Sequence, residues 1–200
     1  MPIQIAIVLP GPRRWAGRMP SLAIHLDRFT FSRQDRLLFD TNVWFFIEGP
    51  QNPDRPDRKV DVYSHALERI LAAGSRLFLD PLVLCEFVNL CARHSCLLDT
   101  GTRDLFKAYR DSDAFLPRAK EIAATVRRIA KRCTPVDCSF STFDLTELVD
   151  EFLQQRPDVN DQLIARVCRA NDLTLVTDDA DFAQLNVTIL SANSRYFSQQ

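Results

Sequence analysis

The sequence predicts an α/β fold with a mainly parallel sheet of four to five strands. Short apolar runs, such as RLLFD at residues 36–40 and TLVT at 174–177, are typical of buried parallel strands. Longer segments with apolar residues at helical spacing, such as 62–73, separate these runs along the chain. Strands that alternate with helices in this way indicate an α/β fold rather than an all-α or all-β one.

The first 35 residues differ from the rest because they carry several prolines and show no sustained hydrophobic period. We interpret residues 1–35 as an irregular N-terminal arm, to which residues 3–9 could add one strand. Residues 36–200 are expected to form one domain. A chain of 200 residues has room for a single compact domain and a short appendage.

From residue 36 onward, the predicted elements follow in regular order. The first strand leads into a helix within TNVWFFI, and a polar, proline-broken loop spans 48–60. A second helix ends at Gly74, a favoured C-cap residue, and Pro81 opens a third helix after a strand at 76–80. The remaining elements are a helix around 114–132, a strand at 133–138, a helix from Asp144, a helix at 161–172, and strands at 174–177 and 187–191.

Composition and charge exclude several classes of protein. The formal net charge of -1 argues against a protein that grips nucleic acid through its whole surface, so any such contact is local or bridged by metal ions. The six cysteines form no CxxC pair, and we interpret them as reduced core thiols. No apolar run approaches the roughly 20 residues that span a bilayer. The start of the chain lacks the basic segment of a secretory signal, so we expect a cytoplasmic protein without a membrane partner.

The most informative side chains are acids at the ends of predicted elements. Asp40 ends the first strand, and Asp179 lies just past the fourth. Ligands of open parallel sheets bind outside the carboxyl ends of the strands, so both carboxylates are expected in one region. Glu86 is the only charged residue in the helical segment 81–92, where a carboxylate is costly without a cation or hydrogen bonds. Asp161 opens an apolar helix, whose dipole favours a negative charge.

Several carboxylates at one site suit hard divalent cations such as Mg²⁺ or Mn²⁺. Such ions neutralise phosphate oxygens and lower the pKa of bound water. The three histidines fall outside every acidic segment, and no Ser or Cys with a partnered base competes as a nucleophile. The sequence therefore predicts a metal site of the nuclease type.

Three segments resemble motifs of the PIN-domain family and, within it, of the VapC-like toxin ribonucleases. LLFDTNVWFF is similar to the family's first strand with its Asp-Thr-Asn signature, here Asp40, Thr41 and Asn42. LFLDPLVLCEF resembles the strand–helix segment that carries the second acid, Glu86. DQLIARVCRANDLTLVTDDADF resembles the closing segment, with Asp161 at its helix start, Thr177 and Asp179 in a Thr-x-Asp step, and Asp181 two positions later. The three motifs occur in the family's order over residues 36–191.

The resemblance implies a three-layer α/β/α fold and a metal-dependent endoribonuclease that hydrolyses phosphodiester bonds in RNA. It implies that one or two Mg²⁺ or Mn²⁺ ions are bound by Asp40, Glu86, Asp161 and Asp179, and that Thr177, Thr41 and Asn42 orient these ligands or a bound water. Asp181 is then either an outer residue that supports the ligands or an occasional ligand itself. The resemblance further implies the toxin of a type II toxin–antitoxin pair, with a small cognate antitoxin and a homodimeric state. Residues 1–35 and the polar loop depart from the common toxin pattern, so an RNA maturation or decay nuclease is the alternative.

Several of these acids also have ordinary structural interpretations. These are a helix cap for Asp40 and for Asp161, a solvent-facing helix position for Glu86, and a turn residue for Asp178 or Asp179. Asp158 could replace Asp161 as cap or ligand, although the run Gln-Leu-Ile-Ala directly after Asp161 favours Asp161.

The segment 114–132 carries basic residues at helical spacing: Arg118, Lys120, Arg127, Arg128, Lys131 and Arg132. They form either the solvated face of an amphipathic helix or a track for the RNA backbone beside the acidic site. We interpret Trp44, Phe45 and Phe46 as core or dimer interface rather than as a platform for base stacking.

Two other functional classes compete with a nuclease. A phosphotransfer protein of receiver or haloacid-dehalogenase type also places an Asp after its first strand, but here position 42 is Asn and no Lys follows residue 131. A non-catalytic PIN-like binding module is expected to lack some of the acidic residues of the site, whereas all four are present in this sequence.

Overall fold

The computed structural model describes residues 5–7, 20–52, 57–137, 140–153 and 158–198. Its strands are β1 (Ile5–Ile7), β2 (Leu22–His25), β3 (Arg36–Phe39), β4 (Arg76–Leu79), β5 (Cys133–Pro135), β6 (Thr174–Val176) and β7 (Thr188–Ser191). Its α-helices are α1 (Thr41–Glu48), α2 (Arg58–Ala73), α3 (Pro81–Thr100), α4 (Phe106–Arg110), α5 (Phe115–Arg132), α6 (Leu145–Leu153) and α7 (Val159–Ala170). Short 3-10 helices include η3 (Ala180–Gln184) and η4 (Ser194–Tyr196).

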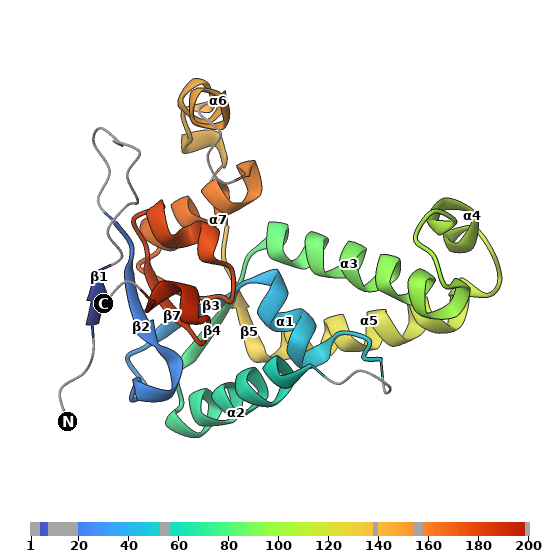
Figure 1. The fold of residues 1–200 in the computed structure, drawn as a ribbon, viewed down its shortest axis with the longest axis horizontal. Helices are drawn as coiled ribbons and strands as arrows, with labels where there is room; N and C mark the ends of the chain where they lie inside the picture. Colours follow the sequence, from blue (N-terminus) through green and yellow to red (C-terminus); the bar gives the residue numbers. More distant parts are fainter. Residues whose placement is uncertain (1–4, 8–19, 53–56, 138–139, 154–157, 199–200) are drawn as a thin grey trace.

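The strands form one seven-stranded sheet in the order β1-β2-β7-β6-β3-β4-β5. Every neighbouring pair is parallel except β1 and β2, which are antiparallel. Helices cover both faces of the sheet, so the predicted three-layer α/β/α fold is confirmed (Figure 1). Figure 1 also shows α3 and α5 running side by side away from the sheet, with α4 at their far end.

The sheet is wider than the four to five strands predicted from the sequence. The five strands of residues 36–200 lie where they were expected, and β1 and β2 are added at one edge. β2 pairs with β7, whose backbone N–H and C=O groups would otherwise form an open edge. A run of four residues gave no clear period, so β2 was not predicted. β1 falls within the strand expected at 3–9, and the other residues of that segment lie outside the described residues.

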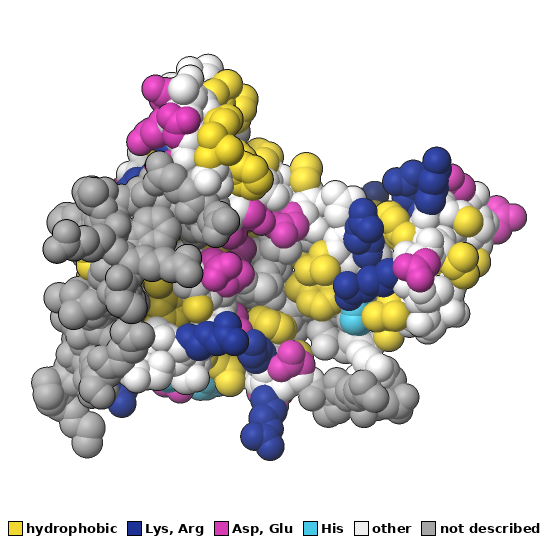
Figure 2. Space-filling view, turned by 45° about the horizontal axis from the view of Figure 1, so that its top comes forward, with side chains coloured by type: hydrophobic (Ala, Val, Ile, Leu, Met, Phe, Trp, Pro, Cys, Tyr) yellow, Lys and Arg dark blue, Asp and Glu magenta, His cyan; other side chains and the backbone are white. Residues whose placement is uncertain are grey.

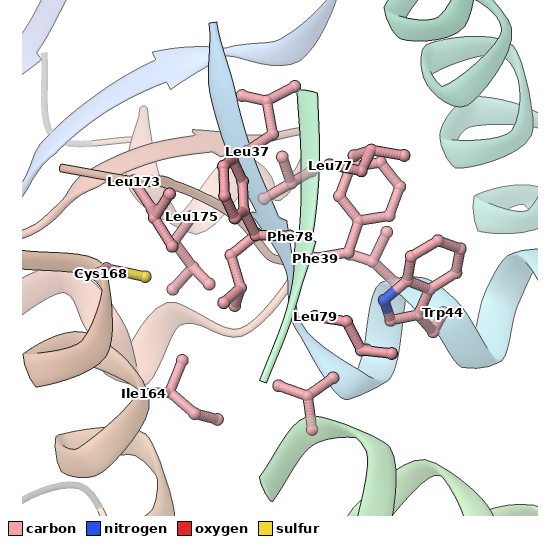
Figure 3. Close-up of a cluster of buried hydrophobic side chains, with 14 of the residues drawn as sticks. Leu37, Phe39, Trp44, Leu77, Phe78, Leu79, Ile164, Cys168, Leu173 and Leu175 are labelled. Carbon is pink, nitrogen blue, oxygen red and sulfur yellow. The ribbon is translucent and has the colours of Figure 1, made fainter. Parts of the chain in front are cut away.

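The core lies around the central strands β3 and β4 (Figure 3). Leu37, Leu38 and Phe39 are each at most 1% exposed, because helices cover both faces of a central parallel strand. The indole of Trp44 on α1 lies 5.0 Å from the ring of Phe39, between ring centroids, so Trp44 is a core residue. Four of the five described cysteines are buried free thiols and Cys85 is exposed, whereas the sixth lies outside the described residues.

Among the described helices, α3 is long and apolar enough, by length and composition, to cross a membrane. From the sequence we predicted no apolar run of that length, and two charged residues, Glu86 and Arg93, lie within this helix. In this structure α3 packs against α1 and α5, and its residues Val83 and Phe87 belong to the core. A core helix of a globular fold passes the same test.

Replacing Trp44 tests this packing. We expect Trp44→Ala to lower the free energy of unfolding by about 3–5 kcal/mol, because the fully buried indole leaves a large cavity. Trp44→Phe is the matched control and should cost far less, since the indole N–H has no hydrogen-bond partner in the described part of the chain. Urea denaturation measures both, and equal losses would contradict the core position.

Candidate metal centre

Two of the predicted motifs meet at the carboxyl edge of the sheet. β3 and β6 are parallel neighbours, with Phe39 opposite Val176 in register. Asp40 and the turn Thr177–Asp179 follow these strand ends, so the chain emerges at the same edge in both places. The backbone N–H of Asp40 donates to the carbonyl oxygen of Val176 at 3.0 Å. The structure thus brings the first and last motifs together.

The carboxylate of Asp40 is 5% exposed and accepts three hydrogen bonds. Its Oδ1 accepts the backbone N–H of Thr41 at 2.7 Å, which makes Asp40 the N-cap of α1. Its Oδ2 accepts the hydroxyl of Thr177 at 2.6 Å and the amide of Asn42. Asp40 is therefore a helix cap, as the structural interpretation expected, and also the centre of a network that joins two motifs.

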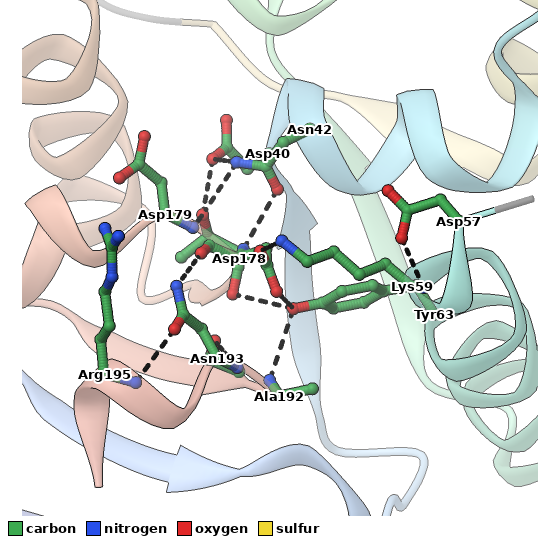
Figure 4. A network of polar contacts seen from close by, with 12 residues as sticks. Asp40, Asn42, Asp57, Lys59, Tyr63, Asp178, Asp179, Ala192, Asn193 and Arg195 are labelled. Carbon is green, nitrogen blue, oxygen red and sulfur yellow. Dashed lines mark hydrogen bonds and ion pairs between the residues drawn. The ribbon is translucent and has the colours of Figure 1, made fainter. Parts of the chain in front are cut away.

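Asn42, which Figure 4 shows close to Asp40, holds this network together with Thr177. Asn42 Nδ2 donates to Thr177 Oγ1 at 3.2 Å, and Asn42 Oδ1 accepts the N–H of Asp178 at 3.1 Å. The side chain of Thr177 is fully buried and accepts the N–H of Asp179 at 3.0 Å. These contacts fix the direction of the Asp40 carboxylate and the path of the chain into Asp179, as groups that orient metal ligands do.

Glu86 on α3 reaches the network through Thr41. Thr41 Oγ1 donates to Glu86 Oε2 at 3.0 Å, and the charge of Glu86 contributes to raising the pKa of Asp40. The side chain of Glu86 is exposed, so the desolvation cost expected from its uncharged helix does not arise. That expectation was wrong because Val83 and Phe87 face the core, which leaves the flank of α3 at Glu86 open to solvent.

Asp158 and Asp161 have different roles in α7. Asp158 is the N-cap, and its Oδ1 accepts the N–H of Asp161 at 3.0 Å. Asp161 lies in the first turn rather than at the helix start, and its side chain is half-buried. Burial, followed by repulsion from Asp158 and Asp40, raises the pKa of Asp161 from 3.8 to about 8. The charge of Asp40 is therefore one of the causes that raise the pKa of Asp161.

The adjacent acids after β6 also differ. Asp178 is 8% exposed, forms an ion pair with Lys59 and accepts the hydroxyl of Tyr63 at 2.9 Å. Asp179 is exposed, and its Oδ1 accepts the N–H of Asp181 at 3.0 Å. Burial and the charge of Asp179 raise the pKa of Asp181, which is also exposed. Asp178 is therefore bound by side chains of the same chain, Lys59 and Tyr63, whereas Asp179 and Asp181 are exposed to solvent.

Lys59, Tyr63 and Asn193 were not predicted as site residues. Asn193 Nδ2 donates to the carbonyl oxygen of Asp178, and the Tyr63 hydroxyl accepts the N–H of Ala192 at 3.4 Å. Tyr63 is 115 positions away from Asp178 in the sequence. No motif or local period links these residues, so only the folded chain reveals their contact.

The acids repel one another across the site. Burial is the main reason that the pKa of Asp40 rises from 3.8 to about 6, the hydrogen bond from Thr177 opposes the rise, and Glu86 and Asp179 add to it. Among the described residues, no three Asp, Glu, His or Cys side chains are converged as a ready metal cluster. The donor set is nonetheless made of carboxylate oxygens, which suit a hard divalent cation. Binding would require these carboxylates to approach one another, and the cation would relieve their repulsion.

Half of the six basic residues of α5 pair with acids. Arg118 pairs with Asp99 at 2.8 Å between Nη2 and Oδ1. Arg128 and Arg132 pair with the two carboxylate oxygens of Glu48 at 2.8 and 2.5 Å. Three of the six cations are therefore neutralised locally, which favours a solvated helix face over a track for the RNA backbone.

Thr177→Val should weaken the binding of a divalent cation by about 10- to 100-fold, because it removes the hydroxyl that orients Asp40 while keeping the side-chain volume. Mn²⁺ titration measures the affinity. Thr174→Val, at the start of the preceding strand β6, is the matched control and should bind as the wild type does. An unchanged affinity in Thr177→Val would contradict the role of this hydroxyl.

One family model matches most of the chain, that of the PIN domain over residues 37–187. Among solved structures, VapBC2 from Rickettsia felis bound to a promoter DNA fragment is 21% identical, with a TM-score of 0.49 over 78% of this chain and 98% of that chain. FitAcB from Neisseria gonorrhoeae is 19% identical, with a TM-score of 0.41 over 77% of this chain and 96% of that chain. No curated protein matches the chain.

Proposed function

The chain belongs to the PIN domain family, and from this premise we propose that residues 36–200 form a metal-dependent endoribonuclease that hydrolyses phosphodiester bonds in RNA. One observation carries the proposal: the hydroxyl of Thr177 donates to the carboxylate of Asp40, which joins the first and last motifs at one edge of the sheet. A helix cap alone would not need a buried hydroxyl from a residue 137 positions away.

The residues that would hold one or two Mg²⁺ or Mn²⁺ ions are Asp40, Glu86, Asp161 and Asp179. A bound divalent cation supplies neutralisation of phosphate oxygens, acidification of water and alignment of the reacting groups. Thr177 and Asn42 hold the Asp40 carboxylate in one orientation, and Thr41 does the same for Glu86. Asp181 lies close enough to Asp179 for the two charges to interact and would serve as an outer carboxylate.

The finer proposal is that the chain is the cytoplasmic toxin of a type II toxin–antitoxin pair, which rests on the similarity of its motifs to VapC-like toxins. Two exposed apolar surfaces support a small antitoxin and a second copy of the chain as partners. One is a groove of about 420 Å³ between α3 and α5, lined by Val88, Phe115, Ile122 and Val126. The other is the outer face of α6, with Leu145, Val149, Phe152 and Leu153 exposed (Figure 2). Apolar patches of this kind commonly mark interfaces.

Purified protein tests the nuclease proposal. We expect it to cleave RNA with Mg²⁺ or Mn²⁺ and to lose this activity in a chelator. Intact RNA under all metal conditions would sink the proposal. Growth arrest on expression, relieved by a neighbouring small open reading frame, tests the toxin proposal. Cleavage without arrest would instead favour an RNA maturation or decay enzyme.

A further inference from the structure

A polar cavity of about 340 Å³ opens beside the candidate metal centre. Its lining consists of Asn42, Lys59, Asp178, Asp179, Ala180, Asn193 and Arg195. The cavity thus adds two cations that belong to none of the three sequence motifs. They come from the start of α2 and from η4, segments far apart in the chain.

Contacts with Asp178 and Phe46 hold the side chain of Lys59 in place. Its ammonium pairs with the buried carboxylate of Asp178 and lies 5.3 Å from the ring centroid of Phe46. Asp178 is fixed in turn by the hydroxyl of Tyr63. The side chain of Lys59 is still 47% exposed, so an ammonium with three donors faces the cavity in a fixed position.

Arg195 stands beside Asp179 (Figure 4). Its backbone N–H donates to Asn193 Oδ1 at 3.0 Å, and the hydroxyl of the next residue, Tyr196, donates to the carbonyl oxygen of Asp179. η4 is therefore tied to the turn that carries Asp179. The side chain of Arg195 is exposed, and its charge reaches Asp181.

A cluster of carboxylates repels the polyanionic backbone of a nucleic acid, so substrate binding requires cations close to the site. The net charge of -1 gives no general attraction, and Arg118, Arg128 and Arg132 on α5 do not line this cavity. Lys59 and Arg195 line a cavity that Asp179 shares. Guanidinium and ammonium groups are the usual protein partners of phosphate.

We infer that Lys59 and Arg195 form a subsite for an RNA phosphate next to the scissile one. This inference rests on the proposed nuclease function and adds how the enzyme would hold its RNA substrate. The subsite would contact the phosphate backbone and not the bases, so it would position the strand independently of its sequence.

The test is the salt dependence of binding to a labelled single-stranded RNA oligonucleotide, in chelator so that no cleavage occurs. Loss of one phosphate contact lowers the slope of log affinity against log salt by about 0.7, so we expect this change in Arg195→Gln and in Lys59→Gln. In metal, each variant should raise KM several-fold with little change in kcat. Lys107→Gln on α4, an exposed lysine outside the cavity, is the matched control and should leave slope and KM unchanged.

Lys59→Gln leaves Asp178 without its cation and could unfold the chain, so Lys59→Arg accompanies it and should restore the slope. A folded Arg195→Gln protein with wild-type slope and KM would overturn the inference while leaving the nuclease proposal intact. A third outcome is that the wild-type protein never cleaves RNA while the variants show the expected lower slope of log affinity against log salt. This result would support the subsite and overturn the nuclease proposal. If the variants kept RNA affinity and lost only a protein partner, the cavity would be a protein-docking site and the inference would be wrong.

Discussion

Asp40→Asn should reduce metal-dependent RNA cleavage by at least about 100-fold, since the substitution removes one charged ligand from the candidate metal centre. Asn is as good an N-cap as Asp, so α1 keeps its capping contact with the N–H of Thr41. The substitution also removes a buried charge that Glu86 and Asp179 repel. The fold should therefore persist, and circular dichroism and thermal unfolding should show this beside the cleavage assay.

The matched control for this prediction is Asp99→Asn at the far end of α3. Asp99 pairs with Arg118 and accepts the hydroxyl of Tyr109, away from the candidate site. Its loss should cost some stability and leave cleavage at the wild-type rate. Wild-type cleavage by folded Asp40→Asn protein would show that Asp40 is only a helix cap.

Metal binding should strengthen steeply as the pH rises. A carboxyl group must lose its proton to coordinate a cation, and the pKa values of Asp40 and Asp161 are raised to about 6 and about 8. Between about pH 6 and about pH 8, Mn²⁺ affinity should rise about tenfold per pH unit, because Asp161 is the group that still releases a proton. Calorimetric titration at several pH values, in buffers of different ionisation heat, measures both the affinity and the released protons.

The stability of the metal-free chain should change in the opposite direction. Both groups have folded-state pKa values above their unfolded value of 3.8, so their contribution to stability is complete below about pH 4 and is lost as the pH rises through about 6 and about 8. The Asp161→Asn variant lacks the pH-dependent contribution of Asp161 to stability. Without metal, the melting temperature of this variant should therefore exceed that of the wild type by an amount that grows from about pH 5 to about pH 8.

Asp158→Asn separates the two acids of α7. Asn still caps the helix, and the lost charge lowers the pKa of Asp161, for which Asp158 is the largest repelling charge. The pH dependence of Mn²⁺ binding should therefore shift to lower pH, with the site retained. If Asp158→Asn lost metal binding and Asp161→Asn retained it, Asp158 and not Asp161 would be the metal ligand.

The sequence predicted most of what places the site. Strand ends are visible as apolar runs that finish in an acid, and parallel strands bring such ends to one edge, so the linear pattern alone places Asp40 and Asp179 together. The β3 and β4 strands are buried on both faces, so apolar and polar residues do not alternate along them. Their assignment as strands of a mainly parallel sheet was correct.

Other features depend on contacts that a linear pattern does not contain. The exposure of Glu86 follows from which flank of α3 the core covers, and β2 forms because β7 offers an open edge. The contact of Lys59 and Tyr63 with Asp178 closes a loop of more than 100 residues. The Thr-x-Asp step of the family resemblance selected Asp179 over Asp178. The contacts of Asp178 with Lys59 and Tyr63 add the physical difference between these adjacent acids, because they bury Asp178 while Asp179 stays exposed.

Calorimetric titration of Mn²⁺ into wild type and Asp179→Asn tests the metal centre most directly. Asp179 is exposed and its carboxylate caps only the short η3 helix, so the substitution should not disturb the core. We expect saturable binding of one or two Mn²⁺ ions to wild type, weakened at least about tenfold in Asp179→Asn. A wild-type protein that binds no Mn²⁺, or binds it as Asp179→Asn does, would contradict a metal centre at these acids and favour a non-catalytic PIN-like module.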